Sequence, residues 1–228
     1  MEKITVNGVS YSYRTKYQTV NAVKDATCTF ETGKVYAIVG ESGSGKSTFL
    51  SLLAGLDLPG GGDIVVDGAD MREKDRDAYR KNEASVVYQA FHLLPLLTVE
   101  ENVTLPMELR GVPKAERKRR AAEFLEKVGL SEETYRKYPK MMSGGEQQRV
   151  AIARSLAAGG QILLADEPTG NLDTANGQNV VDILFELAHR ENYLVIVVTH
   201  NPDVARQADV TYRMKDGVLA PAELDNAS

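Results

Sequence analysis

Residues 40–48 read GESGSGKST, a run that combines glycines with one lysine and several hydroxyl side chains. The order matches the loop of glycine, four residues and then Gly-Lys-Ser that surrounds the phosphates of a nucleoside triphosphate. Lys46 is expected to neutralise the β and γ phosphates, and the Ser47 hydroxyl to bind Mg²⁺. The residues expected to contact the nucleotide are Gly40, Glu41, Ser42, Gly43, Ser44, Gly45, Lys46, Ser47 and Thr48.

A strand and a helix are predicted on the two sides of this phosphate loop. Residues 35–39 form a short apolar run, and residues 49–53 carry leucine and phenylalanine at helical spacing. Strand, loop and helix in this order direct the positive end of the helix into one anion-sized concavity. The alternative is a glycine-rich turn without chemistry, which would not require the lysine and the serine.

A second group of reactive side chains follows another predicted strand. Residues 162–165 are apolar and lead to Asp166 and Glu167, at the strand end where ligands bind in open α/β sheets. Asp166 is expected to hold Mg²⁺ directly or through water, and Glu167 to polarise the attacking water. An acidic pair that only favours a following helix is the alternative. The phosphate loop favours the chemical interpretation.

Alternating strand and helix signals predict an α/β protein with a mainly parallel central sheet, the P-loop NTPase type. Residues 194–198 are a further apolar run, typical of parallel strands covered on both faces. Apolar runs at residues 4–6, 26–30 and 64–66 predict an antiparallel region near the N-terminus. Residues 113–130 are densely charged with one apolar stripe, which predicts a solvated helix of an inserted helical lobe.

Composition limits the class of protein. A chain of 228 residues fits one large α/β domain, and we expect it to occupy residues 1–222 with a disordered tail at 223–228. A formal net charge of -5 argues against a nucleic-acid partner. Cys28 is the only cysteine, which excludes an intrachain disulfide. The apolar runs are too short for a signal peptide or a membrane span, so we expect a chain that stays in the cytosol unless recruited.

Residues 142–149, the signature segment, read MSGGEQQR, and here the chain resembles the ATP-binding cassette (ABC) family, whose signature is LSGGQ. Met142 replaces the usual leucine, and Glu146 stands where glutamine is commonest. The segment is expected to begin an apolar helix and to form a second anion site, although a helix cap is an alternative explanation. In this family the signature of one subunit completes the other subunit's phosphate-loop site. The residues that would contact ATP in this way are Ser143, Gly144, Gly145 and Glu146.

The resemblance covers nearly the whole chain in family order and implies further roles. Gln89 matches the glutamine that touches Mg²⁺ and reports the nucleotide state to the permease. Asp173, with Asn171 and Leu172, matches the loop that crosses the dimer. His200 matches the switch histidine at the γ phosphate, and its place after a strand brings it to the sheet edge of Glu167. Glu167, His200 and Gln89 are therefore the expected catalytic residues.

The adenine contact is assigned to an aromatic side chain near the N-terminus. Tyr13 matches the family residue that stacks on adenine, with Tyr11 and Tyr17 as rivals. A tyrosine packed on the core at the edge of the sheet is the alternative.

The resemblance implies an ATPase that uses ATP and Mg²⁺, forms an ATP-induced homodimer and drives a separate integral membrane permease at the cytoplasmic face of the membrane. It also implies a RecA-like core at about residues 1–89 and 160–220, with the helical lobe at about 90–159. The segments AGLDLPGGG, LPLLTVEENVTLPMEL and ADEPTGNLD resemble the branch of macrolide exporters, lipoprotein-releasing ATPases, the cell-division cassette and antimicrobial-peptide resistance systems. Residues 81–89, KNEASVVYQ, depart from that branch.

Three other kinds of protein fit the sequence less well. A cassette ATPase that acts on DNA or ribosomes would need a coiled-coil or zinc insertion, or a second cassette. A phosphate-loop kinase would not need SGGEQQR, and a nucleotide sensor would not need Glu167.

Overall fold

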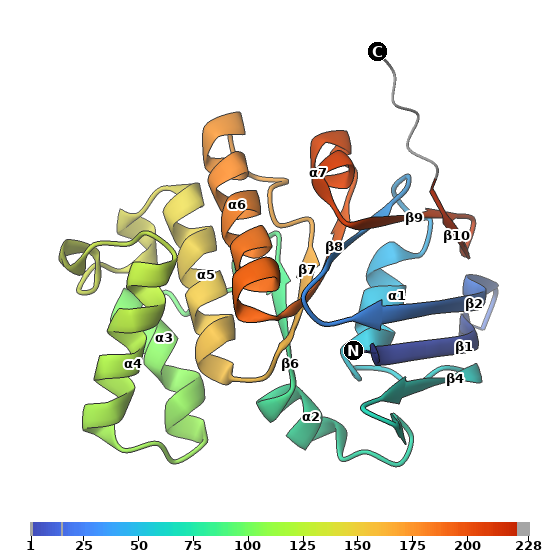
Figure 1. Cartoon of the computed structure of the whole chain (residues 1–228), viewed down its shortest axis with the longest axis horizontal. Coiled ribbons are helices and arrows are strands. Elements are labelled where there is room, and N and C mark those ends of the chain that lie inside the picture. The colour runs from blue at the N-terminus through green and yellow to red at the C-terminus, as the bar shows by residue number, and fades with distance from the viewer. Residues whose placement is uncertain (1, 15, 223–228) are drawn as a thin grey trace.

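The computed structural model describes residues 2–14 and 16–222. The tail predicted at residues 223–228 lies outside the described residues. A six-stranded sheet runs through the molecule in the order β10-β9-β3-β8-β7-β6 (Figure 1). All neighbouring strands are parallel except β9 and β10. These strands are β3 (Val35–Val39), β6 (Ala84–Tyr88), β7 (Ile162–Asp166), β8 (Leu194–Thr199), β9 (Val210–Lys215) and β10 (Val218–Pro221).

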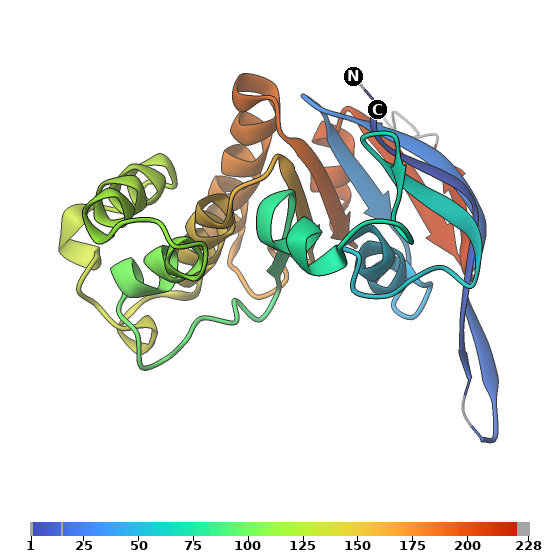
Figure 2. The same cartoon turned by 90° about the horizontal axis from the view of Figure 1, so that it is seen from below.

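A second, antiparallel sheet is built from the N-terminal part of the chain, as the sequence predicts. Its order is β2-β1-β4-β5. The strands are β1 (Glu2–Arg14), β2 (Thr19–Glu31), β4 (Gly61–Val66) and β5 (Ala69–Asp70). The ends of β1 and β2 extend as a long hairpin away from the rest of the molecule (Figure 2).

Helices cover the parallel sheet and form a separate lobe beside it. The helices are α1 (Lys46–Leu53), α2 (Arg76–Asn82), α3 (Val99–Leu109), α4 (Lys114–Lys127), α5 (Gly144–Ala158), α6 (Thr174–Glu191) and α7 (Pro202–Gln207), with short 3-10 turns at Glu132–Thr134 and Pro139–Met141. Figure 1 shows α3, α4 and α5 together at one side. This is the helical lobe that the charged segment predicts, and it is inserted between β6 and β7. The α/β prediction is confirmed.

Two apolar cores lie on the two faces of the parallel sheet. On one face Leu164 and Ile196 pack in a cluster with Phe49 of α1 and with residues of the antiparallel sheet. On the other face Leu163 and Val195 join apolar residues of α5 and α6. Every residue of β8 is buried. Because the central strands are covered on both sides, their carboxyl ends are fixed, and so are the side chains that follow them.

Candidate functional site

The phosphate loop joins β3 to α1 and is shaped by close backbone contacts. Gly45 has a φ of 108°, a conformation that strongly favours glycine. A Cβ at Gly45 would collide with the carbonyl oxygen of Ala22, and one at Gly40 with that of Met214. The Nζ of Lys46 donates to the carbonyl oxygens of Gly40 and Glu41, at 2.9 and 2.8 Å. The backbone of the loop therefore curves around the ammonium group of Lys46, and α1 begins at this residue.

A cavity of about 920 Å³ opens beside this loop and gathers most of the predicted site. The predicted residues that line it are Tyr13, all nine residues 40–48, Gln89, Asp166, Glu167 and His200. Lining residues that the sequence did not predict are Val20, Asn21, Ala22, Lys24, Asp216 and Gly217. They come from β2 and from the turn after β9. The letters Asp-Gly at 216–217 signal a turn, but nothing local says that this turn meets the phosphate loop.

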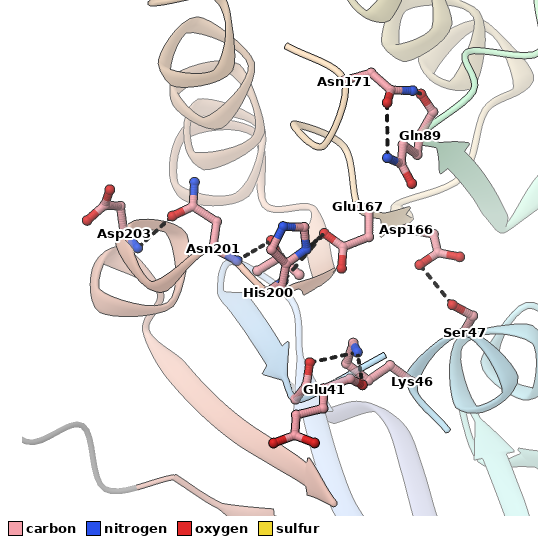
Figure 3. A network of polar contacts seen from close by, with 12 residues as sticks. Glu41, Lys46, Ser47, Gln89, Asp166, Glu167, Asn171, His200, Asn201 and Asp203 are labelled. Atoms are coloured by element: carbon pink, nitrogen blue, oxygen red, sulfur yellow. Dashed lines mark hydrogen bonds and ion pairs between the residues drawn. The ribbon is translucent and has the colours of Figure 1, made fainter. Parts of the chain in front are cut away.

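Asp166 and Ser47 form the oxygen-rich corner of the cavity. The Ser47 hydroxyl donates to the Asp166 carboxylate at 3.1 Å (Figure 3). Burial raises the pKa of Asp166, and the hydrogen bond from Ser47 partly opposes the rise. A hydroxyl and a carboxylate that converge in this way are the hard oxygen donors that Mg²⁺ takes, and Mg²⁺ fills its other positions with water and phosphate. The residues present therefore fit this ion.

Glu167 and His200 face each other across the strand ends. The carboxylate of Glu167 lies 2.9 Å from Nδ1 of His200 (Figure 3). Neighbouring residues of a strand point to opposite faces. Glu167 has a φ of 49°, which breaks this alternation and lets both acidic side chains line the same cavity. A left-handed conformation at a non-glycine residue costs about 1–3 kcal/mol and is typical of functional sites.

Tyr13 is the one of the three tyrosines considered for adenine that lines the cavity. Its hydroxyl lies 3.3 Å from the Thr48 hydroxyl, and its ring meets Tyr11 edge to face at 5.1 Å. Tyr13 is 45% exposed, so part of it remains accessible to a stacking base. Tyr17 is 90% exposed on the projecting hairpin, away from the cavity lining.

The signature segment lies outside this cavity. Ser143 is the N-cap of α5, and its backbone N–H and hydroxyl donate to the Glu146 carboxylate at 2.8 and 2.9 Å. These bonds lower the pKa of Glu146. Asp173 similarly caps α6 by accepting from the Asn176 N–H at 2.9 Å. Within the described part of the chain, none of the predicted residues Ser143, Gly144, Gly145, Glu146 and Asp173 lines the cavity.

Comparison with known proteins decides what this arrangement is. A family model described as ABC transporter matches residues 23–170. The chain belongs to the ABC transporter family. It is similar to the ABC transporter ATP-binding protein YvrO of Bacillus subtilis, with 43% identity over 99% of both chains. It is 42% identical to the macrolide export ATP-binding/permease protein MacB of Photorhabdus laumondii, covering 94% of this chain and 33% of that protein.

Solved ABC cassettes have the same fold. A dimeric, post-hydrolysis structure of the ATP-binding cassette MJ0796 bound to ADP and Pi superposes with a TM-score of 0.87, at 35% identity, covering 97% of this chain and 99% of that one. The chain is thus the ATP-hydrolysing, nucleotide-binding domain of the ABC family. None of the helices in the described part of the chain has both the length and the apolar character needed to cross a membrane.

Gln89 lines the cavity and contacts a residue beyond it. Its side-chain amide donates to the amide oxygen of Asn171 at 3.1 Å (Figure 3). The turn that follows has two consecutive left-handed residues, Phe91 and His92. The guanidinium of Arg154 in α5 donates to both of their carbonyl oxygens, at 2.9 and 2.6 Å. Burial lowers the pKa of Arg154. The helix of the signature segment therefore holds the turn after Gln89.

Proposed function

We propose that ATP binding induces two copies of this ABC ATPase to close on two ATP molecules, and that the pair drives a separate membrane permease. The main observation in favour of the dimer is which residues line the cavity. The phosphate loop, Glu167 and His200 line it, whereas no residue of the signature segment does, among those that the structure describes. The start of α5 is thus left to serve the nucleotide of another copy. The dimeric MJ0796 structures support this arrangement.

Seven of the residues that line the cavity have a specific role in this proposal. Lys46 binds the β and γ phosphates, and Tyr13 stacks on adenine. Ser47, Asp166 and Gln89 would hold Mg²⁺, which would supply positive charge against the negative charge that develops on the phosphates. Glu167 accepts a proton from the attacking water. His200 lies against Glu167. In this proposal it orients Glu167 and contacts the γ phosphate from the same side.

The dimer is tested by Ser143→Arg, which places a long cation where a small cap faces the second copy. We expect ATP hydrolysis to fall at least about 100-fold, the scale for losing a donor to a developing charge. Calorimetric affinity of the monomer for ATP should stay the same. Ser131→Arg, at an exposed cap of a 3-10 turn, is the matched control. A wild-type rate in Ser143→Arg would show that one chain's site is sufficient.

The proposed docking site for the permease is the turn after Gln89. Leu96 is 87% exposed and Leu94 43%, although both are apolar. Asn102 is fully buried beneath them, and its amide donates to the carbonyl oxygens of Leu94 and Leu97 at 3.1 Å and accepts from the Leu94 N–H at 2.8 Å. A rigidly held, exposed leucine fits an apolar contact with a partner. The similarity to MacB, which has a permease part, supports a membrane partner and hence a place at the cytoplasmic face.

Leu96→Glu tests this docking site. We expect copurification with the permease to be lost, while basal ATPase and melting temperature stay unchanged, because Leu96 touches solvent and not the core. Leu109→Glu is the control, since Leu109 is 70% exposed at the other end of α3. Normal permease binding by Leu96→Glu would contradict the assignment.

A further inference from the structure

Gln89 and Asn171 are held together by a reciprocal pair of hydrogen bonds. The amide nitrogen of Asn171 donates to the backbone carbonyl of Gln89 at 3.1 Å, and the side-chain nitrogen of Gln89 donates to the amide oxygen of Asn171 at 3.1 Å. The two residues are 82 positions apart in sequence. Gly170 leaves room for the pair, since a Cβ there would lie 2.7 Å from the Gln89 nitrogen.

The two bonds fix which way each amide faces. A backbone carbonyl only accepts, so Asn171 must present its nitrogen to the carbonyl of Gln89. This leaves the oxygen of Asn171 facing the Gln89 side chain. An amide oxygen also only accepts, so Gln89 must answer with its nitrogen. The orientation follows from donors and acceptors alone.

The oxygen of Gln89 is therefore turned away from Asn171. Figure 3 shows it on the side of the amide that faces Asp166. Gln89 lines the cavity, where Asp166 and Ser47 supply the other oxygen ligands. A metal ion binds the oxygen of an amide and not its nitrogen. If the amide were rotated by half a turn, Gln89 would present a donor to the ion and weaken the site.

We propose that Asn171 is a positioning residue that sets the amide orientation of Gln89 for Mg²⁺. This rests on the proposed role of Gln89 as a ligand of the ion. Asn171 itself is exposed and does not line the cavity, so it acts through Gln89. It belongs to the loop directly before α6, the helix that Asp173 caps. The same contact therefore connects Gln89 to the start of that helix.

The test measures affinity for the β,γ-imido analogue of ATP, once with Mg²⁺ and once with EDTA. The ratio of the two affinities reports the contribution of the ion without turnover. Asn171→Ala should lower this ratio about three- to tenfold, the scale of one or two hydrogen bonds, and leave the EDTA value unchanged. Asn179→Ala removes an amide from the exposed face of α6 and should change neither value.

A second variant distinguishes an effect of Asn171 on the amide orientation of Gln89 from a general structural effect on the loop. In Gln89→Glu both side-chain oxygens can bind the ion, so orientation no longer matters. Adding Asn171→Ala to Gln89→Glu should then cause no further loss. A loss that persists in this background means that Asn171 acts structurally, and it would overturn the proposal.

Gln89→Ala distinguishes failure of this inference from failure of the proposed function. If Gln89→Ala lowers the ratio and Asn171→Ala does not, the positioning role is wrong and the ligand role of Gln89 stands. If Gln89→Ala leaves the ratio unchanged, the ligand role itself is wrong. Melting curves of all variants check that each one folds.

Discussion

The phosphate loop and the signature segment both place glycines at the start of a buried helix, but the two starts are satisfied differently. At α1 the N-cap is Gly45, which has no side chain to cap the helix. At α5 the Glu146 carboxylate accepts from Ser143 and occupies the positive end of the helix. The first start is open toward a cavity and is ready for phosphate. At the second, any phosphate from another copy must compete with an internal carboxylate.

The largest effect on ATP hydrolysis is expected from a change in the cavity that a single chain forms by itself. Glu167→Gln removes the base and should slow ATP hydrolysis about 10²–10⁴-fold without loss of ATP binding. Phosphate release measures the rate, and size-exclusion chromatography with ATP should show a trapped dimer. Glu133→Gln, at an exposed position, is the control. Normal hydrolysis by Glu167→Gln would remove this residue from the mechanism.

Lys46→Ala should show which of the two helix starts binds ATP in the single chain. A charge-assisted hydrogen bond contributes about 1.5–3 kcal/mol, so we expect ATP affinity to fall by a factor of at least about 10 to 100. The variant also loses the bonds that hold the carbonyls of Gly40 and Glu41. Calorimetry measures the affinity, with exposed Lys81→Ala as the control. Unchanged ATP affinity would mean that the nucleotide binds elsewhere, with the start of α5 as the first place to look.

Asp166→Asn should make the ATP-free protein more stable and less active. Burial raises the pKa of Asp166 in the folded state, so its protonated form stabilises the fold below the unfolded pKa. That stability is lost as pH rises through the folded pKa. At pH 7 the variant should therefore melt higher than wild type, and the difference should shrink as pH falls. Part of the carboxyl reaches solvent, which keeps the gain below about 1 kcal/mol, or about 2–4 °C.

A thermal scan of Asp166→Asn and wild type between pH 4 and pH 7 checks this sign. The asparagine can still accept from Ser47, so the hydrogen bond is not lost with the charge. A variant that melts lower than wild type at pH 7 would show that the carboxylate stabilises the empty site.

The sequence predicts the parts of the site that are local in the chain. A strand, a glycine-rich loop and a helix are contiguous, so residues 40–48 could be placed without knowledge of the fold. Asp216 and Gly217 could not, because the parallel pairing of β3 with β9 brings their turn to the phosphate loop. The contact of Gln89 with Asn171 also joins residues that are far apart in sequence. Glu146 is ambiguous for another reason, since the sequence SGGE fits both a helix cap and a phosphate site, and the structure shows the cap.

The smallest effect should come from Glu146→Gln, which tests the competition at α5 directly. In the proposed dimer the carboxylate faces the phosphates of the other copy's ATP, and repulsion should weaken closure. Removing one charge near a helix end changes the free energy by about 0.3–1 kcal/mol, so half-maximal dimerisation should need about two- to fivefold less ATP. Glutamine still completes the capping box, so the melting temperature should change little.

The measurement is light scattering against ATP concentration in the Glu167→Gln background, where hydrolysis does not dissolve the dimer. If the effect is electrostatic, it must shrink as salt is raised from about 0.05 to 1 M, because the screening length falls from above 10 Å to about 3 Å. Glu133→Gln controls for the loss of one net charge. A salt-independent shift would instead indicate that glutamine contacts ATP better than glutamate does. No shift at low salt would mean that the carboxylate turns away from the interface when the second copy binds, and that the cap and the phosphate site do not compete.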